Sequence, residues 1–334
     1  MNALNVINNI KPYAVIGIIG LAKNTGKTTT LNALITRLQK ETIAITSIGL
    51  DGEQIDQMTY LPKPKIQVKK GIIVATTTEC LKQSQLDYDT LETTSIKTAI
   101  GRVIIVKIKS EGNIVVAGPT TNSDLKKVIE KLKKYANKVF VDGAFNRITF
   151  ANIDCIDGII LATGASVHAQ MEKTVAYTKS IIDSFSFEQT IHPIPLQAPL
   201  MAQTKSDIYF CKRKTIASLN EKAVKDTLQT LYLKGAITSS LIDGFIKHNY
   251  QHFTLVLEDA TKLLIPPKYH TYLSNLAINI EVLKAIKLIA VTINPFSPKG
   301  NHYQPSAFLK AMQNATRVPV YNVLESEAKY ETYT

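Results

Sequence analysis

The chain has 334 residues, of which 45% are apolar and 20% are charged, as in a globular protein large enough for two domains. Its formal net charge of +12 is compatible with an anionic partner such as a nucleic acid, a membrane surface or a polyphosphate nucleotide. The lysines fall singly or in pairs among helically spaced apolar residues, which favours solvated helix faces over a nucleic-acid-binding stripe. Three cysteines without a C-x-x-C pair argue against a disulfide framework or a zinc site, and no run approaches the roughly 18 apolar residues of a membrane span. We expect a soluble cytoplasmic protein that does not bind a membrane.

The first elements in chain order are a strand, a glycine-punctuated loop and a helix. Residues 14–19 form a continuous apolar, β-branched run, which is the pattern of a strand buried on both faces of a parallel sheet. From Thr28 onward, Leu31, Leu34 and Leu38 recur at helical spacing. Further strands are predicted at residues 43–48, 71–76, 138–141 and 158–162. This alternation predicts an α/β fold with a doubly wound, mostly parallel sheet.

Local signals give more detail between and after these strands. Residues 103–108 and 114–117 are separated by a polar stretch containing glycine, and we predict a hairpin or a strand pair at one sheet edge. Ser123 is predicted to cap the helix that follows. A later helix is expected to carry Met171 and Ile181 on its apolar face.

Composition changes at Pro193 and Pro195, two prolines in three residues that interrupt any regular element. We therefore expect one domain in residues 1–190 and a smaller C-terminal α/β domain in residues 191–334 that contacts a client or a substrate. Strands are predicted in this second part at residues 254–257, 278–280, 286–293 and 318–323, and helices at residues 239–247 and 305–312.

The loop after the first strand matches a phosphate-binding pattern. Residues 20–28 read GLAKNTGKT, which satisfies G-x-x-x-x-G-K-[ST] between a strand and a helix. The glycines let backbone N–H groups turn toward phosphates, Lys27 supplies a charge to the β and γ phosphates, and Thr28 offers a hydroxyl to Mg²⁺. The residues expected to bind the nucleotide are Gly20, Lys23, Asn24, Thr25, Gly26, Lys27, Thr28 and Thr29. Residues 1–190 are thus predicted to be a P-loop nucleotide-binding domain.

Two carboxylates are predicted to complete a catalytic and metal-binding group with Lys27 and Thr28. Asp142 ends an apolar strand and precedes a glycine, the position of an acid that contacts the Mg²⁺ shell. Asp51 ends the second strand and is a candidate for positioning the attacking water and for contacting the metal, although Asp-Gly is also a common turn pair. ATP and GTP are both open at this point, and no metal other than Mg²⁺ is expected.

Other polar residues have two interpretations each. Lys23 can neutralise charge in a transition state or face solvent. His168 has no partner acid in sequence and is not assigned a catalytic role. The loops at residues 259–262 and 294–300 each follow a predicted strand, and suit either ligand binding or a structural role.

The loop, Asp51 and Asp142 together resemble the MinD, ParA and cobyrinate-synthase branch of P-loop proteins, the SIMIBI class, to which dethiobiotin synthetase is related. The resemblance covers residues 13–185 and implies ATP, Mg²⁺, a parallel sheet and an acid after the second strand. The nucleotide-sandwich dimers of this branch carry a signature lysine after the first loop glycine, where this chain has Leu21. A homodimer is compatible with the resemblance. Because Lys23 is displaced from the signature position, the resemblance does not imply that a lysine of one subunit acts at the nucleotide site of the other.

A closer resemblance is to the P-loop subunits of reactivases for lysine 5,6-aminomutase. It rests on the stretches at residues 20–30, 47–53, 141–144 and 291–295. Such proteins are implied to use ATP to exchange damaged cobalamin on an adenosylcobalamin-dependent aminomutase, together with a second, MutS-like ATPase subunit. The mutase client and the second subunit are implied by this resemblance alone.

Three functions compete on these observations. The first is an ATPase, acting as a reactivase or chaperone component, that changes the conformation of a client protein. The second is a small-molecule ATP-dependent ligase of the dethiobiotin or cobyrinate synthase type, although Cys211 lacks the sequence context of a glutaminase nucleophile. The third, a partitioning ATPase on nucleic acid or membrane, agrees with the positive charge but lacks a terminal basic amphipathic helix.

Overall fold

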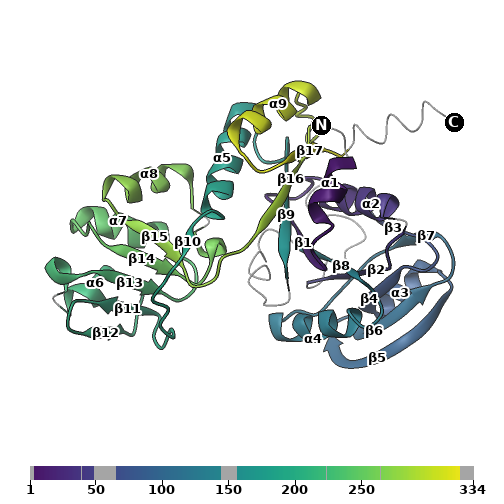
Figure 1. Cartoon of the computed structure of the whole chain (residues 1–334), viewed down its shortest axis with the longest axis horizontal. Coiled ribbons are helices and arrows are strands. Elements are labelled where there is room, and N and C mark those ends of the chain that lie inside the picture. Colours follow the sequence, from purple (N-terminus) through teal and green to yellow (C-terminus); the bar gives the residue numbers. More distant parts are fainter. Residues whose placement is uncertain are drawn as a thin grey trace. The chain divides into compact units, whose positions relative to one another are not determined.

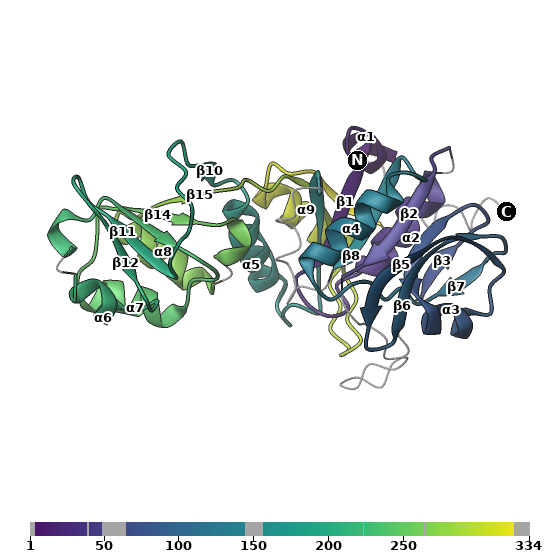
Figure 2. The ribbon, with the colours of Figure 1, turned by 90° about the horizontal axis from the view of Figure 1, so that it is seen from below.

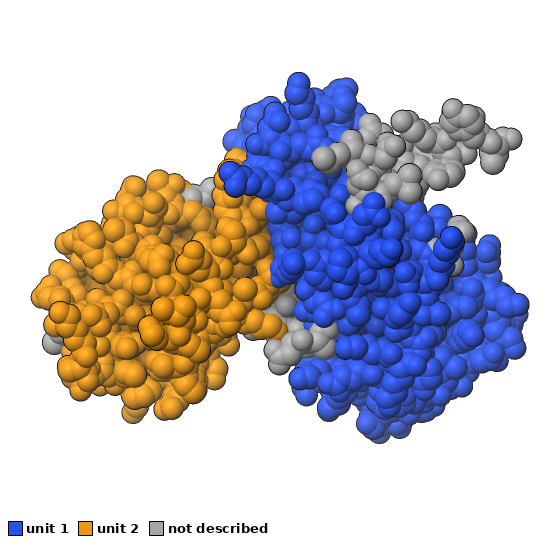
Figure 3. Space-filling view, in the orientation of Figure 1, with its two compact units in different colours: residues 1–175, 287–334 blue, residues 176–286 orange. Residues whose placement is uncertain are grey.

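The computed structural model of the chain describes residues 4–38, 40–48, 65–143, 156–222, 224–263 and 265–323. Within them the protein has an α/β fold with a nine-stranded, mostly parallel sheet and a second, six-stranded sheet that is also mostly parallel (Figures 1 and 2). The contacts divide the chain into two compact units (Figure 3). Unit 1 comprises Met1–Val175 with Lys287–Thr334, and unit 2 comprises Ala176–Ile286. The predicted fold class is confirmed.

The sheet of unit 1 has the strand order β17-β16-β9-β1-β8-β2-β4-β6-β5. Its strands are β1 (Val15–Gly20), β2 (Ile43–Ser47), β4 (Ile73–Thr77), β5 (Tyr88–Thr98), β6 (Gly101–Ile108), β8 (Lys138–Gly143), β9 (Gly158–Gly164), β16 (Leu288–Asn294) and β17 (Val320–Asn322). Neighbours from β17 to β4 are parallel, whereas β6 and β5 pair antiparallel. Every residue of β1 and of β9 is buried, as the unbroken apolar runs predict for central parallel strands.

Helices cover both faces of this sheet. They are α1 (Leu4–Ile10), α2 (Lys27–Arg37), α3 (Thr78–Ser84), α4 (Asn122–Leu132), α5 (Met171–Ser184), which continues into unit 2, and α9 (Pro305–Ala315). Leu31 and Leu34 of α2 pack in one buried cluster with Ile18 and Phe140 of the central strands. In Figure 1 α4 lies on the opposite side of the sheet from α2. The candidate phosphate-binding loop therefore leads into a helix that packs on the central strands of the sheet.

Unit 2 has its own sheet, in the order β10-β15-β14-β13-β11-β12. Its elements are β10 (Glu188–Gln189), β11 (Leu200–Gln203), β12 (Ile208–Cys211), α6 (Ile216–Asn220), β13 (Thr230–Leu233), α7 (Ser239–Lys247), β14 (Thr254–Leu257), α8 (Pro267–Asn275) and β15 (Asn279–Val282). Leu219, Phe245 and Leu273 of the three helices share one core with Leu231 and Leu255 of the sheet. The unit thus has a hydrophobic core of its own.

The expected boundary between residues 190 and 191 differs from this division. Strands β16 and β17, which were expected in a C-terminal domain, extend the sheet of unit 1, because β16 pairs with β9. Unit 2 is therefore an insertion within unit 1, which contains the predicted nucleotide-binding loop. Pro193 and Pro195 lie in the segment between β10 and β11, whose Ile194 and Leu196 pack on Tyr232 of the unit 2 sheet.

Two local predictions in unit 1 are wrong. The predicted hairpin does not form, because β6 pairs with β4 and β5, while β7 (Gly112–Ile114) pairs with β3 (Ile66–Val68) in a separate two-stranded sheet. The cap of α4 is Thr121 rather than Ser123, since the Thr121 side chain accepts a hydrogen bond from the backbone N–H of Asp124 at 3.1 Å. Strand β5 was not predicted.

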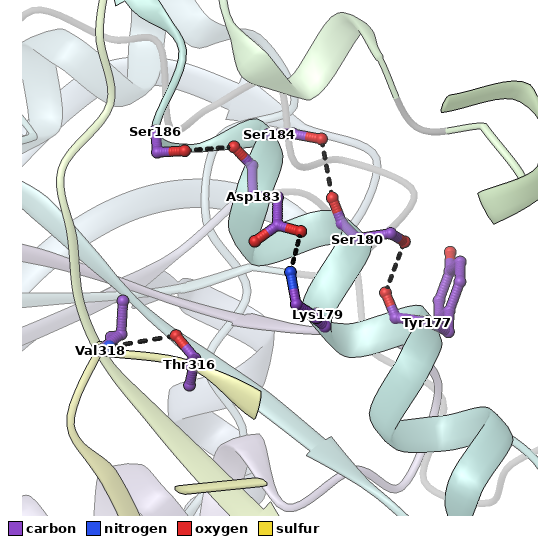
Figure 4. A network of polar contacts seen from close by, with 8 residues as sticks. All are labelled: Tyr177, Lys179, Ser180, Asp183, Ser184, Ser186, Thr316 and Val318. Atoms are coloured by element: carbon purple, nitrogen blue, oxygen red, sulfur yellow. Dashed lines mark hydrogen bonds and ion pairs between the residues drawn. The ribbon is translucent and has the colours of Figure 1, made fainter. Parts of the chain in front are cut away.

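Helix α5 carries the chain from one unit into the other, and local polar contacts hold its second half (Figure 4). Lys179 pairs with Asp183 at 2.5 Å, and the hydroxyls of Ser180 and Ser184 donate to the carbonyls of Tyr177 and Ser180 at 2.8 and 3.0 Å. These bonds all lie within one helix. None of the helices formed by the described residues combines the length and apolar character needed to cross a lipid bilayer.

Unit 2 is expected to lose stability in mild acid through His270 of α8. Burial lowers the pKa of His270, although the negative charge of Asp183 opposes the shift. The Nε2 atom is shielded and has no hydrogen-bond partner among the described residues. The unfolded chain therefore takes up a proton at higher pH than the folded chain, so the stabilising contribution is complete above about pH 6.5 and is lost as the pH falls toward the lowered pKa.

Urea unfolding followed at pH 8 and at pH 5 tests this prediction. The loss of unfolding free energy on acidification should be smaller in His270→Gln than in the wild type. His248→Gln, which replaces an exposed histidine at the end of α7, is the control and should behave as the wild type does. Equal pH dependence in all three proteins would contradict the assignment.

Candidate phosphate-binding site

The loop that joins β1 to α2 lies at the carboxyl end of the central strand. Strand β1 lies between β8 and β9 in the sheet and ends at Gly20, and α2 begins at Lys27. Asn24 and Gly26 have φ angles of 62° and 90°, so the loop turns twice through the left-handed region that glycine adopts at little cost. No side chain caps α2, whose N-cap is Gly26. Its first N–H groups have no acceptor within the helix and suit an anion.

Gly20 and Lys27 are packed against each other. A Cβ atom on Gly20 would lie 2.4 Å from Oγ1 of Thr25 and 2.9 Å from Cγ of Lys27. The aliphatic part of Lys27 therefore passes over the end of β1, and any larger residue at position 20 would displace it. Thr25 is 1% exposed and its hydroxyl donates to the carbonyl of Ala22 at 3.0 Å, so this side chain closes the loop on itself.

Two residues from distant parts of the chain hold the loop at Asn24. The carbonyl oxygen of Asn24 accepts hydrogen bonds from Nδ2 of Asn294 at 3.1 Å and from Oγ of Ser166 at 3.3 Å. Neither Asn294 nor Ser166 was predicted from the sequence to belong to the site. The signal was present in part, because Asn294 directly follows a predicted strand, but nothing local indicates that its strand lies two positions from β1 in the sheet.

Asp142 lies on the strand next to β1 and on the same face of the sheet as α2. It is level with Ile18 of β1 and with Ser47 of β2. Side chains two apart on a strand share a face, and Phe140 packs in the cluster that contains Leu31 of α2. Asp142 is half-buried, and its Oδ1 atom is shielded from solvent. The structure thus places the predicted acid on the face of the sheet from which the loop continues into α2.

The other predicted site residues lie in the first turn of α2, at the surface or outside the described residues. Thr28 and Thr29 lie half-buried in the first turn of α2, and Lys23 is exposed. Asp51 lies outside the described residues, four positions after β2 ends. His168 has a local structural role, since its Nδ1 accepts from the N–H of Gln170 at 2.9 Å.

Oxygen ligands for Mg²⁺ are available near the loop. No group of three or more His, Cys, Asp and Glu side chains able to hold a metal ion occurs in the described part of the chain. A nucleotide-associated Mg²⁺ needs few protein ligands, because phosphate oxygens and waters complete its shell. The hydroxyl of Thr28 and the carboxylate of Asp142 are of the kind that this ion prefers, so the residues present fit it.

Fold and site together define an α/β protein whose central parallel strand ends in a glycine-bounded loop with a lysine at the start of the next helix. No protein-family model matches the sequence, and no curated protein or solved structure is significantly similar to it.

Proposed function

We propose that this protein binds Mg-ATP at the loop of residues 20–28 and hydrolyses it. The observation that carries the proposal is the packing of Lys27 over Gly20 beside the uncapped start of α2. This arrangement brings a lysine side chain and the unpaired N–H groups of a helix terminus to one end of a buried strand. Such a site favours the clustered negative charge of a polyphosphate.

The predicted site residues have separate roles in the proposed reaction. Lys27 binds the β and γ phosphates, and the loop N–H groups hold the chain of phosphates in position. Thr28 and Asp142 would hold Mg²⁺, which neutralises charge on the phosphate oxygens when it is bound. Asp51 orients the water that attacks the γ phosphorus, the bond to the bridging oxygen breaks, and ADP and phosphate are released.

We also propose that hydrolysis serves a protein client, namely an adenosylcobalamin-dependent aminomutase served with a second, MutS-like subunit. This rests on the resemblance of the loop and of the stretch ending in Asn294 and Pro295 to reactivase P-loop subunits. The separately packed α/β unit begins within α5 and ends before β16, and the strands around the loop of residues 20–28 form one contiguous sheet without it. This separation supports a protein-contacting role for the inserted unit.

The alternative is a small-molecule ligase in which ATP activates a carboxylate. Its amidating form uses a nucleophilic cysteine. Burial raises the pKa of the Cys211 thiol, which donates to the carbonyl of Ser218 at 3.5 Å. A protonated, hydrogen-bonded thiol is a poor nucleophile, so Cys211 does not support that form.

Phosphate release measured with ATP and with GTP, in Mg²⁺ and in EDTA, tests the proposal. We expect slow Mg²⁺-dependent release by the protein alone and faster release with an adenosylcobalamin-dependent aminomutase and its MutS-like partner. Release that depends instead on an added small carboxylate would favour the ligase, and no release in any mixture would refute hydrolysis.

Asp51→Ala is expected to leave ATP affinity near the wild-type value and to lower kcat by about 100-fold, because the residue acts on the attacking water rather than on the bound nucleotide. Single-turnover phosphate release and equilibrium binding separate the two effects. Wild-type turnover in this variant would show that Asp51 is a turn residue only.

A further inference from the structure

We infer that Asn294 is a positioning residue that holds the phosphate loop in its binding conformation, and that Ser166 assists it. The inference rests on the proposed function and deepens it, because it assigns the control of the loop to the two strands that flank the inserted unit. Ser166 follows β9, before the chain enters unit 2, and Asn294 ends β16, by which the chain returns.

The two hydrogen bonds meet the loop where its backbone conformation is least common. The backbone of Asn24 is in the left-handed region, at a φ of 62°, although the residue is not a glycine. Gly26 follows at a φ of 90°. Such conformations persist where the surrounding structure holds them. Here the Asn24 carbonyl receives two side-chain donors, Nδ2 of Asn294 and Oγ of Ser166, which set the orientation of the peptide that follows it.

Asn294 is itself held rigidly. Its Oδ1 accepts the N–H of Phe296 at 3.1 Å, and its backbone carbonyl accepts the N–H of Ala165 at 2.9 Å. A Cβ atom on Gly164 would lie 2.2 Å from this carbonyl oxygen, and one on Gly26 would lie 3.1 Å from Cβ of Asn294. Gly164 thus lets the end of β16 approach the end of β9 closely, and Gly26 lets it approach the loop.

Strand β16 makes a second hydrogen bond, to helix α2, from the same face of the strand as Asn294. Thr292, two residues before Asn294, shares a hydroxyl hydrogen bond of 2.8 Å with Thr30 of α2, and both side chains are 1% exposed. One strand therefore bonds both to the loop and to the helix that follows it. The two bonds can be removed separately, which makes the role of Asn294 testable.

Phosphate binding depends on the direction of the loop N–H groups. Without the Nδ2 donor the Asn24 carbonyl keeps only the longer hydrogen bond from Ser166, so its peptide is less restrained and the N–H groups that follow it are less well aligned. A displacement of about 1 Å in a positioning group can cost up to about 100-fold in rate. We expect Asn294→Ala to weaken Mg-ATP binding by about 10-fold or more, and Ser166→Ala to have a smaller effect.

The experiment combines amide hydrogen exchange of the nucleotide-free protein with the binding of Mg-ATP and urea unfolding. In Asn294→Ala, and to a lesser degree in Ser166→Ala, exchange in residues 21–30 should accelerate while the urea midpoint stays near that of the wild type. The control Thr292→Val removes the bond to the helix but keeps the donor to Asn24. It should lower the urea midpoint and leave the exchange of residues 21–26 unchanged.

These readouts separate the inference from the proposed function. If the wild type binds no Mg-ATP, the proposed function fails, and the exchange of the nucleotide-free variants still tests the positioning role. If Asn294→Ala and Ser166→Ala bind Mg-ATP and exchange as the wild type does, the positioning role is refuted. An Asn294→Ala variant that fails to fold leaves Ser166→Ala as the deciding protein.

Discussion

Replacing Lys27 with alanine is expected to raise the Kd for Mg-ATP by about 100-fold and to abolish phosphate release. The side chain of Lys27, the first residue of α2, packs over Gly20 at the end of β1, where its ammonium group would reach the β and γ phosphates of the proposed nucleotide. Hydrogen bonds to charged groups contribute about 1.5 to 3 kcal/mol each, and about 3 kcal/mol corresponds to roughly 100-fold in Kd. Titration with a fluorescent ATP analogue gives the change in Kd.

The matched control removes the same charge away from the loop. Lys40 is exposed beyond the end of α2, and Lys40→Ala should bind Mg-ATP as the wild type does. Both variants should unfold in urea near the wild-type midpoint, since neither lysine is part of a buried cluster. ATP binding by Lys27→Ala at the wild-type Kd would show that the loop is not the phosphate site.

The second large effect is expected for Asp142→Asn, in which the side chain keeps its size and loses its negative charge. The residue lies on the strand next to β1 and on the α2 face of the sheet. A neutral amide cannot compensate the charge of Mg²⁺ as the carboxylate does, so kcat for ATP should fall by about 100-fold, the size found when one charge-stabilising group is lost. The Kd for Mg-ATP should rise less.

Phosphate release across a range of Mg²⁺ concentrations measures this effect. Asp142→Asn should need more Mg²⁺ for half-maximal release than the wild type. Asp89→Asn is the control, because Asp89 lies on the edge strand β5 in an exposed ion pair with Lys109. If Asp142→Asn and Asp89→Asn release phosphate equally fast, Asp142 has no part in the reaction.

The sequence alone determined those features that depend on neighbouring residues. The buried run before Gly20, the loop of residues 20–28 and the helical spacing of Leu31 and Leu34 are contiguous, so their order along the chain already specifies a strand, a turn and a helix. The position of Asp142 at the end of β8 was likewise predicted, because an apolar run followed by Asp-Gly marks a strand end.

Edge and cap positions were predicted less well, for a local reason. The residues of β5 are mostly polar, and a strand at the edge of a sheet needs no continuous apolar run because much of it faces solvent. Thr121 and Ser123 are both good capping residues, and only the backbone geometry shows which side chain accepts the N–H of Asp124.

Pairing across the insertion was decided by the tertiary structure. Strands β9 and β16 are neighbours although unit 2 separates them, and Asn294 meets Asn24 across 270 positions of sequence. Such contacts leave no periodic signal, because they depend on how buried strands from distant segments order themselves in one sheet. The chain specifies the loop of residues 20–28 locally, whereas the sheet brings Asn294 and Ser166 to the Asn24 carbonyl.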